Sequence, residues 1–151
     1  MEIRGIETAF VTMHTGLGCF REIDVEDLTK HKMDSDLINV DSEAVKKVNT
    51  AKAEGRKICA VGTSVQRVLE TATLTGGMLK EYDGWTSKFI FPEHHFEVAN
   101  CMIANFYAPY STMLMLTTAF GGYDYVMNAY EVALKEGYRF GLYGDAMLII
   151  D

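Results

Sequence analysis

The sequence has little cysteine and no cysteine motif. Its three cysteines, Cys19, Cys59 and Cys101, lie about forty residues apart. An odd number of cysteines without a CxxC pair indicates neither a disulfide framework nor a zinc site. The four histidines do not supply the spacing of three or four zinc ligands either, so we expect no metal. The thiols are therefore interpreted as buried or incidental, in a reducing compartment.

Long apolar runs are also lacking. The longest, around residues 113–120, is interrupted by two threonines, whereas a membrane helix requires roughly 20 apolar residues. Three charged residues among the first seven break up any apolar region that a signal peptide would need. We predict no membrane association and a cytoplasmic location.

Basic charge is scarce as well. The chain has 14 Lys and Arg residues against 21 Asp and Glu residues, which gives a net charge of −7. Nucleic-acid binders usually carry a basic footprint, because neutralised phosphates supply most of their non-specific affinity. The densest basic stretch, residues 46–57, is diluted by Glu54. Charge alone therefore argues against strong RNA binding by this chain.

What is present is the composition of a globular α/β protein. The chain has 151 residues, of which 48% are hydrophobic and 23% charged, enough for one domain with a sizeable core. Asp41 or Ser42 is a suitable N-cap for a helix that ends near Glu54, before Gly55. A short apolar strand at 58–61 and a second helix after 62–64 follow. This succession favours an α/β layout with some parallel strand pairing.

The remaining segments complete a mixed sheet with flanking helices, in a single α/β unit over residues 1–151. We predict strands at 5–14, 89–91, 96–106 and 146–150, helices at 112–120 and 123–136, an irregular extended stretch at 24–39, and an exposed turn-rich stretch at 75–85.

Two loops in the first half combine glycine with polar side chains. In residues 12–21, Gly16 and Gly18 allow close approach of a ligand, and His14 can titrate near neutral pH. A glycine turn with a hydrogen-bonded histidine is an equally good interpretation, because a short G-x-G is weak evidence. In residues 61–67, Gly62 and Thr63 begin a helix whose free N–H groups suit an anion, and an arginine follows one turn later. An ordinary capped helix is the better interpretation of these residues alone.

Two further loops lie in the second half. Residues 105–112 offer Asn105 for a purine edge and aromatic rings for stacking, although a Pro-set turn capped by Ser111 explains them equally. Residues 138–147 place Asp145 at the start of the last strand, where an aspartate is usually a turn former. A catalytic or ribose-binding role for this carboxylate is the sharper alternative.

Together, and in this order, the four loops resemble a known family. With the strings His31-Lys32-Met33, Gly84-Trp85-Thr86 and Phe89-Ile90-Phe91-Pro92, they are similar to the C-terminal half of the S-adenosylmethionine:tRNA ribosyltransferase-isomerases of queuosine biosynthesis. The resemblance covers nearly the whole chain and rests on the joint order of the motifs. It implies that Met1 corresponds to an internal position and that the N-terminal portion of the enzyme is absent.

The resemblance implies a reaction and its site. Enzymes of this family transfer the ribosyl group of S-adenosylmethionine to 7-aminomethyl-7-deazaguanine in tRNA and rearrange it to epoxyqueuosine, so that S-adenosylmethionine is a consumed co-substrate and no cofactor stays bound. His14 and Asp145 are the candidates for acid or base. The expected substrate-binding residues are Thr15, Gly16, Gly18, Arg21, Gly62, Thr63, Arg67, Asn105, Ser111 and Thr112. His31 and Lys32, with Arg21, are expected to meet the RNA backbone.

Some positions depart from the family pattern. Cys19 stands in place of a threonine, Glu22 of a proline and Asp34 of a histidine, while Tyr107 and Tyr110 replace a histidine and a lysine. The last two changes remove possible cationic contacts. They leave open a second hypothesis, a non-catalytic nucleoside-binding or S-adenosylmethionine-binding module, and a third, a scaffold that needs a partner chain.

Overall fold

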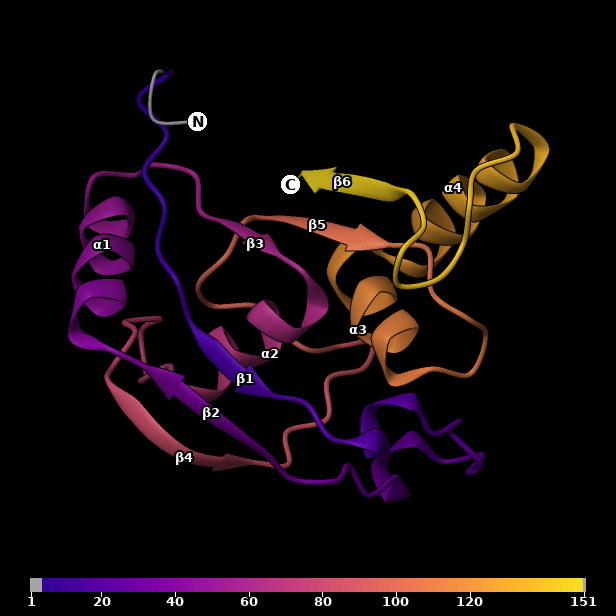
Figure 1. Ribbon diagram of the computed structural model, residues 1–151, viewed down its shortest axis with the longest axis horizontal. Helices are drawn as coiled ribbons and strands as arrows, with labels where there is room; N and C mark the ends of the chain where they lie inside the picture. The colour runs from indigo at the N-terminus through magenta and orange to yellow at the C-terminus, as the bar shows by residue number, and fades with distance from the viewer. Residues whose placement is uncertain (1–3, 151) are drawn as a thin grey trace.

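The computed structural model describes residues 4–150, which form two small sheets and four α-helices (Figure 1). The strands are β1 (Thr12–His14), β2 (Asp36–Val40), β3 (Cys59–Val61), β4 (Tyr82–Thr86), β5 (Cys101–Asn105) and β6 (Ala146–Ile150). The helices are α1 (Ser42–Ala53), α2 (Thr63–Thr71), α3 (Thr112–Gly121) and α4 (Tyr123–Lys135). Two 3₁₀ turns, Leu17–Phe20 and Leu28–Lys30, separate β1 from β2.

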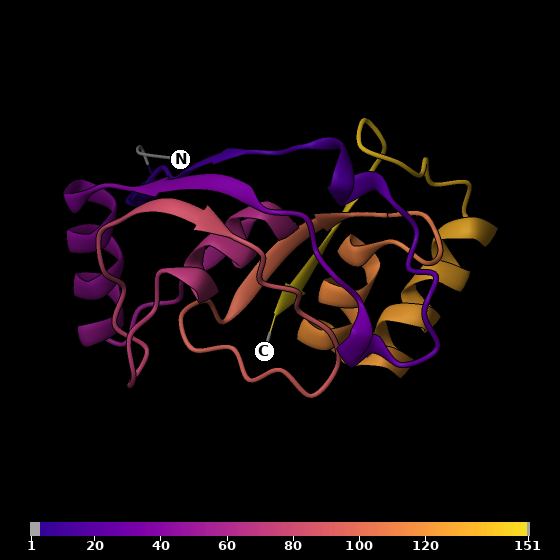
Figure 2. The same ribbon diagram turned by 90° about the horizontal axis from the view of Figure 1, so that it is seen from below.

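The strands divide into two three-stranded sheets. The first has the order β1-β2-β4 and is antiparallel throughout. The second has the order β3-β5-β6, with β3 parallel to β5 and β6 antiparallel to it. Seen from the side, α1 lies at one end of the molecule and α4 at the other (Figure 2). The predicted mixed α/β class is therefore confirmed, whereas its division into two sheets was not anticipated.

Helices cover one face of the second sheet. Ala60, Met102 and Ala104 point to that face and are almost fully buried in the core that α2, α3 and α4 share. The alternate side chains of the same strands point the other way, and Val61, Leu148 and Ile150 are each about 60% exposed. Period-two alternation thus separates a packed face from an open, apolar one.

Local chemistry explains where the helices begin. The Asp41 carboxylate accepts the Ala44 N–H at the start of α1, and Ser111 Oγ accepts the Leu114 N–H at the start of α3. These side chains satisfy N–H groups that have no acceptor within their helix. The predictions for these helices, for the helix at 123–136 and for the strand at 146–150 are confirmed to within a few residues.

Several strand predictions were wrong. Residues 89–91 form no strand, and Phe89 and Ile90 line a cavity instead. The strand predicted at 96–106 begins only at Cys101, since the Glu97 N–H is taken by the Glu70 side chain. Of the strand predicted at 5–14 only Thr12–His14 pairs, and Cys59 in the strand predicted to be buried is exposed.

The turn-rich stretch and the irregular stretch also contain strands. Tyr82–Thr86 pairs with β2 as an edge strand, and its Gly84 and outward-facing Trp85 explain why it resembles a turn in sequence. Asp36–Val40, predicted as part of an irregular extension, is the central strand of the first sheet. Strand pairing across distant segments decided both cases.

Within residues 4–150, no helix has the length and apolar character needed to span a bilayer. The same residues contain no group of three or more His, Cys, Asp or Glu side chains placed to hold a metal ion.

Candidate functional site

A cavity of about 310 Å³ lies where the loops of the two sheets meet. That volume is in the range of small-molecule sites. Its lining is mainly apolar, with a few hydroxyl and amide groups. The lining residues are Met13, Thr15, Cys19, Phe20, Met33, Gly62, Thr63, Ser64, Arg67, Lys88, Phe89, Ile90, Asn105, Tyr107, Thr112, Met113, Leu116 and Leu142.

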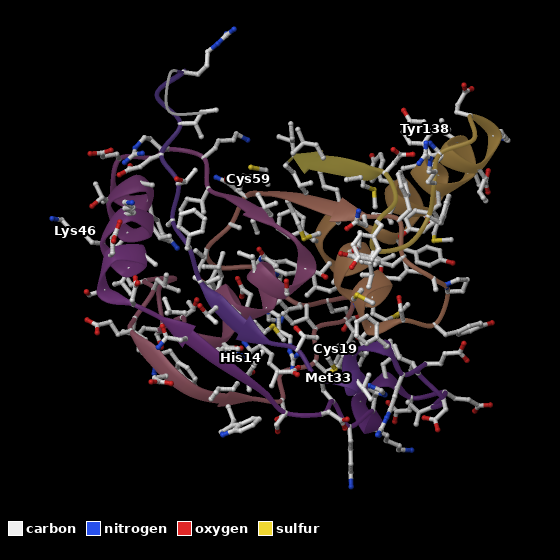
Figure 3. The ribbon with its side chains drawn as sticks, in the orientation of Figure 1. His14, Cys19, Met33, Lys46, Cys59 and Tyr138 are labelled. Carbon is white, nitrogen blue, oxygen red and sulfur yellow. The ribbon has the colours of Figure 1, made fainter. Side chains whose placement is uncertain are left out.

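The first wall of the cavity follows β1. Thr15 leads into the 3₁₀ turn that carries Cys19 and Phe20, and Figure 3 shows Cys19 and Met33 in this region, close to the end of β1. A Cβ atom at Gly18 would collide with the side chain of Asp34, so only glycine fits at this position. Gly18 therefore allows the close approach expected of the glycine loop, but the group that approaches its backbone is the Asp34 side chain and not a ligand.

The second wall is the start of α2. Gly62, in a left-handed conformation with φ of 101°, turns the chain from β3 into the helix. The cavity is bordered by Gly62, Thr63 and Ser64, so the first turn of the helix lies against it. The backbone N–H groups of a first turn have no intrahelical acceptor, and they favour a negative group nearby.

The third wall comes from β5 and α3. Asn105 and Tyr107 follow the end of β5, and Thr112 and Met113 open α3. The Thr63 hydroxyl donates to the Tyr107 hydroxyl oxygen at 3.3 Å, which links this wall to the second. Polar groups from three walls thus converge on an otherwise apolar space.

A buried ion pair lies beneath these walls. Arg67 Nη1 is 2.5 Å from Asp36 Oδ2, and both side chains are at most 5% exposed. The other carboxylate oxygen, Oδ1, accepts the Gly16 N–H at 2.7 Å, and the Cys19 thiol donates to Oδ2 at 3.3 Å. Asp36 therefore accepts from the glycine loop and from α2 at once.

This environment shifts two pKa values in opposite directions. Burial raises the pKa of the Cys19 thiol to about 11, and its hydrogen bond to the Asp36 carboxylate adds to the effect. Burial also opposes ionisation of Asp36, but hydrogen bonds from Gly16, Arg67 and Cys19 outweigh it and lower the pKa of that carboxyl. At neutral pH, Asp36 is charged and Cys19 is a neutral thiol.

The structure brings six of the predicted site residues together. Thr15, Gly62, Thr63, Arg67, Asn105 and Thr112 line the same cavity, although they come from segments up to about a hundred residues apart. Two more, Gly16 and Ser111, lie next to lining residues and make backbone-ordering contacts. Gly16 donates to Asp36, and Ser111 caps α3.

The two predicted acid–base residues do not line the cavity. His14 is exposed at the end of β1, between the lining residues Met13 and Thr15 (Figure 3). The Asp145 carboxylate accepts the Arg139 N–H at 2.7 Å, as a turn former does. Asn105 donates to the carbonyl of Asp145, so the turn that Asp145 closes is tied to the cavity wall.

The residues expected to meet RNA lie outside the cavity. His31 packs against Phe89 with ring centroids 4.6 Å apart, which places its imidazole behind a lining residue. Arg21 is exposed and lies 3.7 Å from the Asp34 carboxylate, and Lys32 is exposed.

Sequence reasoning missed several site residues. Asp36 was overlooked because a single acidic residue at the start of an apolar strand resembles a strand boundary. A charge directly before the apolar pair Leu37-Ile38 was the available signal. Met113 and Leu116 lie in an apolar helix, where such residues normally belong to the core, and only the packed structure shows that they also line the cavity.

The fold and this site define a class: a mixed α/β protein with a cavity of about 310 Å³ assembled from loops at the junction of two sheets. The chain belongs to the queuosine biosynthesis protein family, whose sequence model matches residues 1–149.

Similar proteins agree with this assignment. The chain is 67% identical over 151 residues to the S-adenosylmethionine:tRNA ribosyltransferase-isomerase of Phocaeicola vulgatus, and 64% identical to that of Bacteroides fragilis. All of the chain is matched, but it spans only 43% of the length of either relative. The crystal structure of S-adenosylmethionine tRNA ribosyltransferase from Thermotoga maritima superposes with a TM-score of 0.79 at 37% identity, covering 99% of this chain and 47% of that one.

Proposed function

We propose that the chain forms the co-substrate pocket of an S-adenosylmethionine:tRNA ribosyltransferase-isomerase, acting with a further portion that such enzymes possess. The observation that carries the proposal is the cavity at the junction of the two sheets, built from the same loops whose order carries the family resemblance. The substrates would be S-adenosylmethionine, which is consumed, and tRNA bearing 7-aminomethyl-7-deazaguanine, in the cytoplasm.

The chemistry of the cavity suits S-adenosylmethionine. The first turn of α2 at Gly62, Thr63 and Ser64 favours the carboxylate of the methionine part. Asn105, whose amide nitrogen donates to the carbonyls of Gly144 and Asp145, offers its amide oxygen to a purine base. The rest of the lining is largely apolar and disfavours water, and the ribosyl transfer requires that water be kept out.

His14 and Asp145 remain the proposed acid–base residues, because both are next to or bonded to residues that line the cavity. His14 lies between two lining residues, and Asp145 is tied to the lining residue Asn105. Gly18 and Ser111 would shape the pocket, whereas Arg21, His31 and Lys32 are proposed to meet the tRNA.

Titration calorimetry of the chain with S-adenosylmethionine tests the pocket. The Thr112 hydroxyl donates to the Cys19 carbonyl at 3.5 Å, so its oxygen is what it offers a ligand as an acceptor. Thr112→Val removes this acceptor and should weaken binding about fivefold to tenfold, the value of one lost hydrogen bond. Thr118→Val is the matched control, since Thr118 is a buried threonine in the same helix that does not line the cavity. Undetectable binding by the wild-type chain, or equal effects of the two substitutions, would refute the pocket assignment.

A chimera tests the reaction. This chain would replace the matched 151 residues of the Phocaeicola vulgatus relative, and epoxyqueuosine would be measured by mass spectrometry of digested tRNA. We expect product from the chimera and none from the chain alone. A chimera that binds S-adenosylmethionine yet forms no product would instead support the non-catalytic binding module.

A further inference from the structure

The guanidinium of Arg67 has no hydrogen-bond donor left for a ligand. An arginine carries five N–H groups. Nε donates to the Lys88 carbonyl, Nη1 to Asp36 Oδ2 and the Cys19 sulfur, and Nη2 to the carbonyls of Asp34 and Thr86. The side chain is 5% exposed, so its fork is fully used inside the protein although the residue borders the cavity.

These acceptors belong to separate segments of the cavity lining. Cys19 and Lys88 line it directly, and Asp34 and Thr86 lie within two residues of the lining residues Met33 and Lys88. One cation on α2 thus fastens the glycine loop, the segment before β2 and the segment after β4. None of these three segments belongs to an α-helix, and the glycine loop contains only the short 3₁₀ turn Leu17–Phe20.

Asp36, at the start of β2, holds the glycine loop together with Arg67. Its Oδ1 holds the Gly16 N–H, and its Oδ2 receives both the Cys19 thiol and Arg67. The glycine loop is therefore attached to Asp36 at two points three residues apart. A carboxylate with a single partner would not restrain the loop in this way.

We propose that Asp36 and Arg67 are a positioning pair that holds three lining segments of the S-adenosylmethionine cavity in place, namely the glycine loop, the segment before β2 and the segment after β4, and that Arg67 does not itself contact the co-substrate. The proposal rests on the proposed function, which it deepens. It changes the role of Arg67 from a ligand-binding residue to a residue that acts through the backbone of others, with Asp36 as its partner.

A second buried pair provides the matched control. The Glu70 carboxylate is 2% exposed and accepts from His94 Nε2 and from the Glu97 N–H, both at 3.1 Å. Neither Glu70 nor His94 lines the cavity described above. Asp36→Asn and Glu70→Gln therefore make the same chemical change at two buried carboxylates, only one of which supports the cavity.

Two measurements on the full chain test the proposal. Native-state amide hydrogen exchange, followed by NMR, should become at least tenfold faster at Gly16 and across residues 86–90 in Asp36→Asn, but not in Glu70→Gln. The S-adenosylmethionine dissociation constant should rise at least tenfold in Asp36→Asn and stay within twofold in Glu70→Gln. Arg67→Lys, which keeps the charge but has three donors for five acceptors, should reproduce both effects of Asp36→Asn.

The outcomes separate the possible roles. Weaker binding in Arg67→Lys without faster exchange in the lining segments would identify Arg67 as a direct ligand and overturn the proposal, as would equal effects of Asp36→Asn and Glu70→Gln. If Asp36→Asn does not fold, Arg67→Lys decides by the same readouts. If the wild-type chain does not bind S-adenosylmethionine, the proposed function fails, and unchanged exchange at Gly16 would independently overturn the positioning pair.

Discussion

Arg67→Met removes the cation of the buried pair and leaves the Asp36 carboxylate, 2% exposed, without its charged partner. Breaking a buried pair in this way typically costs about 3–5 kcal/mol, because an uncompensated charge stays in the interior. Three backbone carbonyls that accept from Arg67 also lose their donor. Arg67 Nη1 also donates to the Asp36 carboxylate and to the Cys19 sulfur. The contact with the carboxylate is the larger loss, because it is the one between two buried charges. We expect a loss of about 4 kcal/mol in the free energy of unfolding.

The double variant Arg67→Met with Asp36→Leu isolates the cost of the unpaired charge. Replacing both partners by apolar residues leaves no buried ion, and such replacements are often close to neutral. The Gly16 N–H and the three carbonyls remain unsatisfied, so we expect recovery of about half of the loss.

Urea unfolding followed by circular dichroism measures both effects. With a slope of about 2 kcal/mol per molar, the single variant should lower the unfolding midpoint by about 2 M and the double variant by about 1 M. A single variant that loses less than about 1 kcal/mol, or a double variant that loses as much as the sum of the two single variants, would refute the argument from the buried charge.

Three further predictions concern single groups. Because the pKa of Asp36 is lowered in the fold, its ionised form stabilises the protein above the ordinary aspartate pKa of about 3.9, and this contribution is lost as the pH falls through the folded-state pKa. Urea unfolding midpoints should therefore drop more steeply in acid for the wild type than for Asp36→Asn, and parallel curves would contradict this. Gln66 is fully buried, and neither polar atom of its amide has a hydrogen-bond partner among residues 4–150. Gln66→Met should therefore raise the free energy of unfolding by about 1–2 kcal/mol, whereas a lower melting temperature in thermal denaturation would show that the amide is satisfied. Ser111 Oγ accepts the Leu114 N–H at the start of α3 and donates to the Ala108 carbonyl, so Ser111→Ala should cost about 1 kcal/mol or more in urea unfolding. Ser111→Thr keeps the hydroxyl and should retain most of the stability, and equal losses in both variants would argue against capping.

The helices could be predicted from the sequence because their signals are local. Asp41 and Ser111 cap α1 and α3 through contacts within three residues, and Gly137 follows α4 in a left-handed conformation. The last strand could be predicted for a similar reason, since a short apolar run after a Gly-Asp turn needs no distant partner to be recognised. The strands Asp36–Val40 and Tyr82–Thr86 could not, because they are defined by pairing with each other and contain residues that locally favour turns.

By itself the sequence determined the α/β class, the four polar loops and their order, which is sufficient for family membership, since these are properties of neighbouring residues. Only the tertiary structure decided how the loops are used. It brought six of the predicted residues to one cavity, and it uses all five donors of Arg67 within the protein. Asp36 shows the physical reason. Its carboxylate contacts Gly16 and Arg67, which are 20 and 31 residues away, and contacts between segments so far apart produce no regular spacing in the sequence.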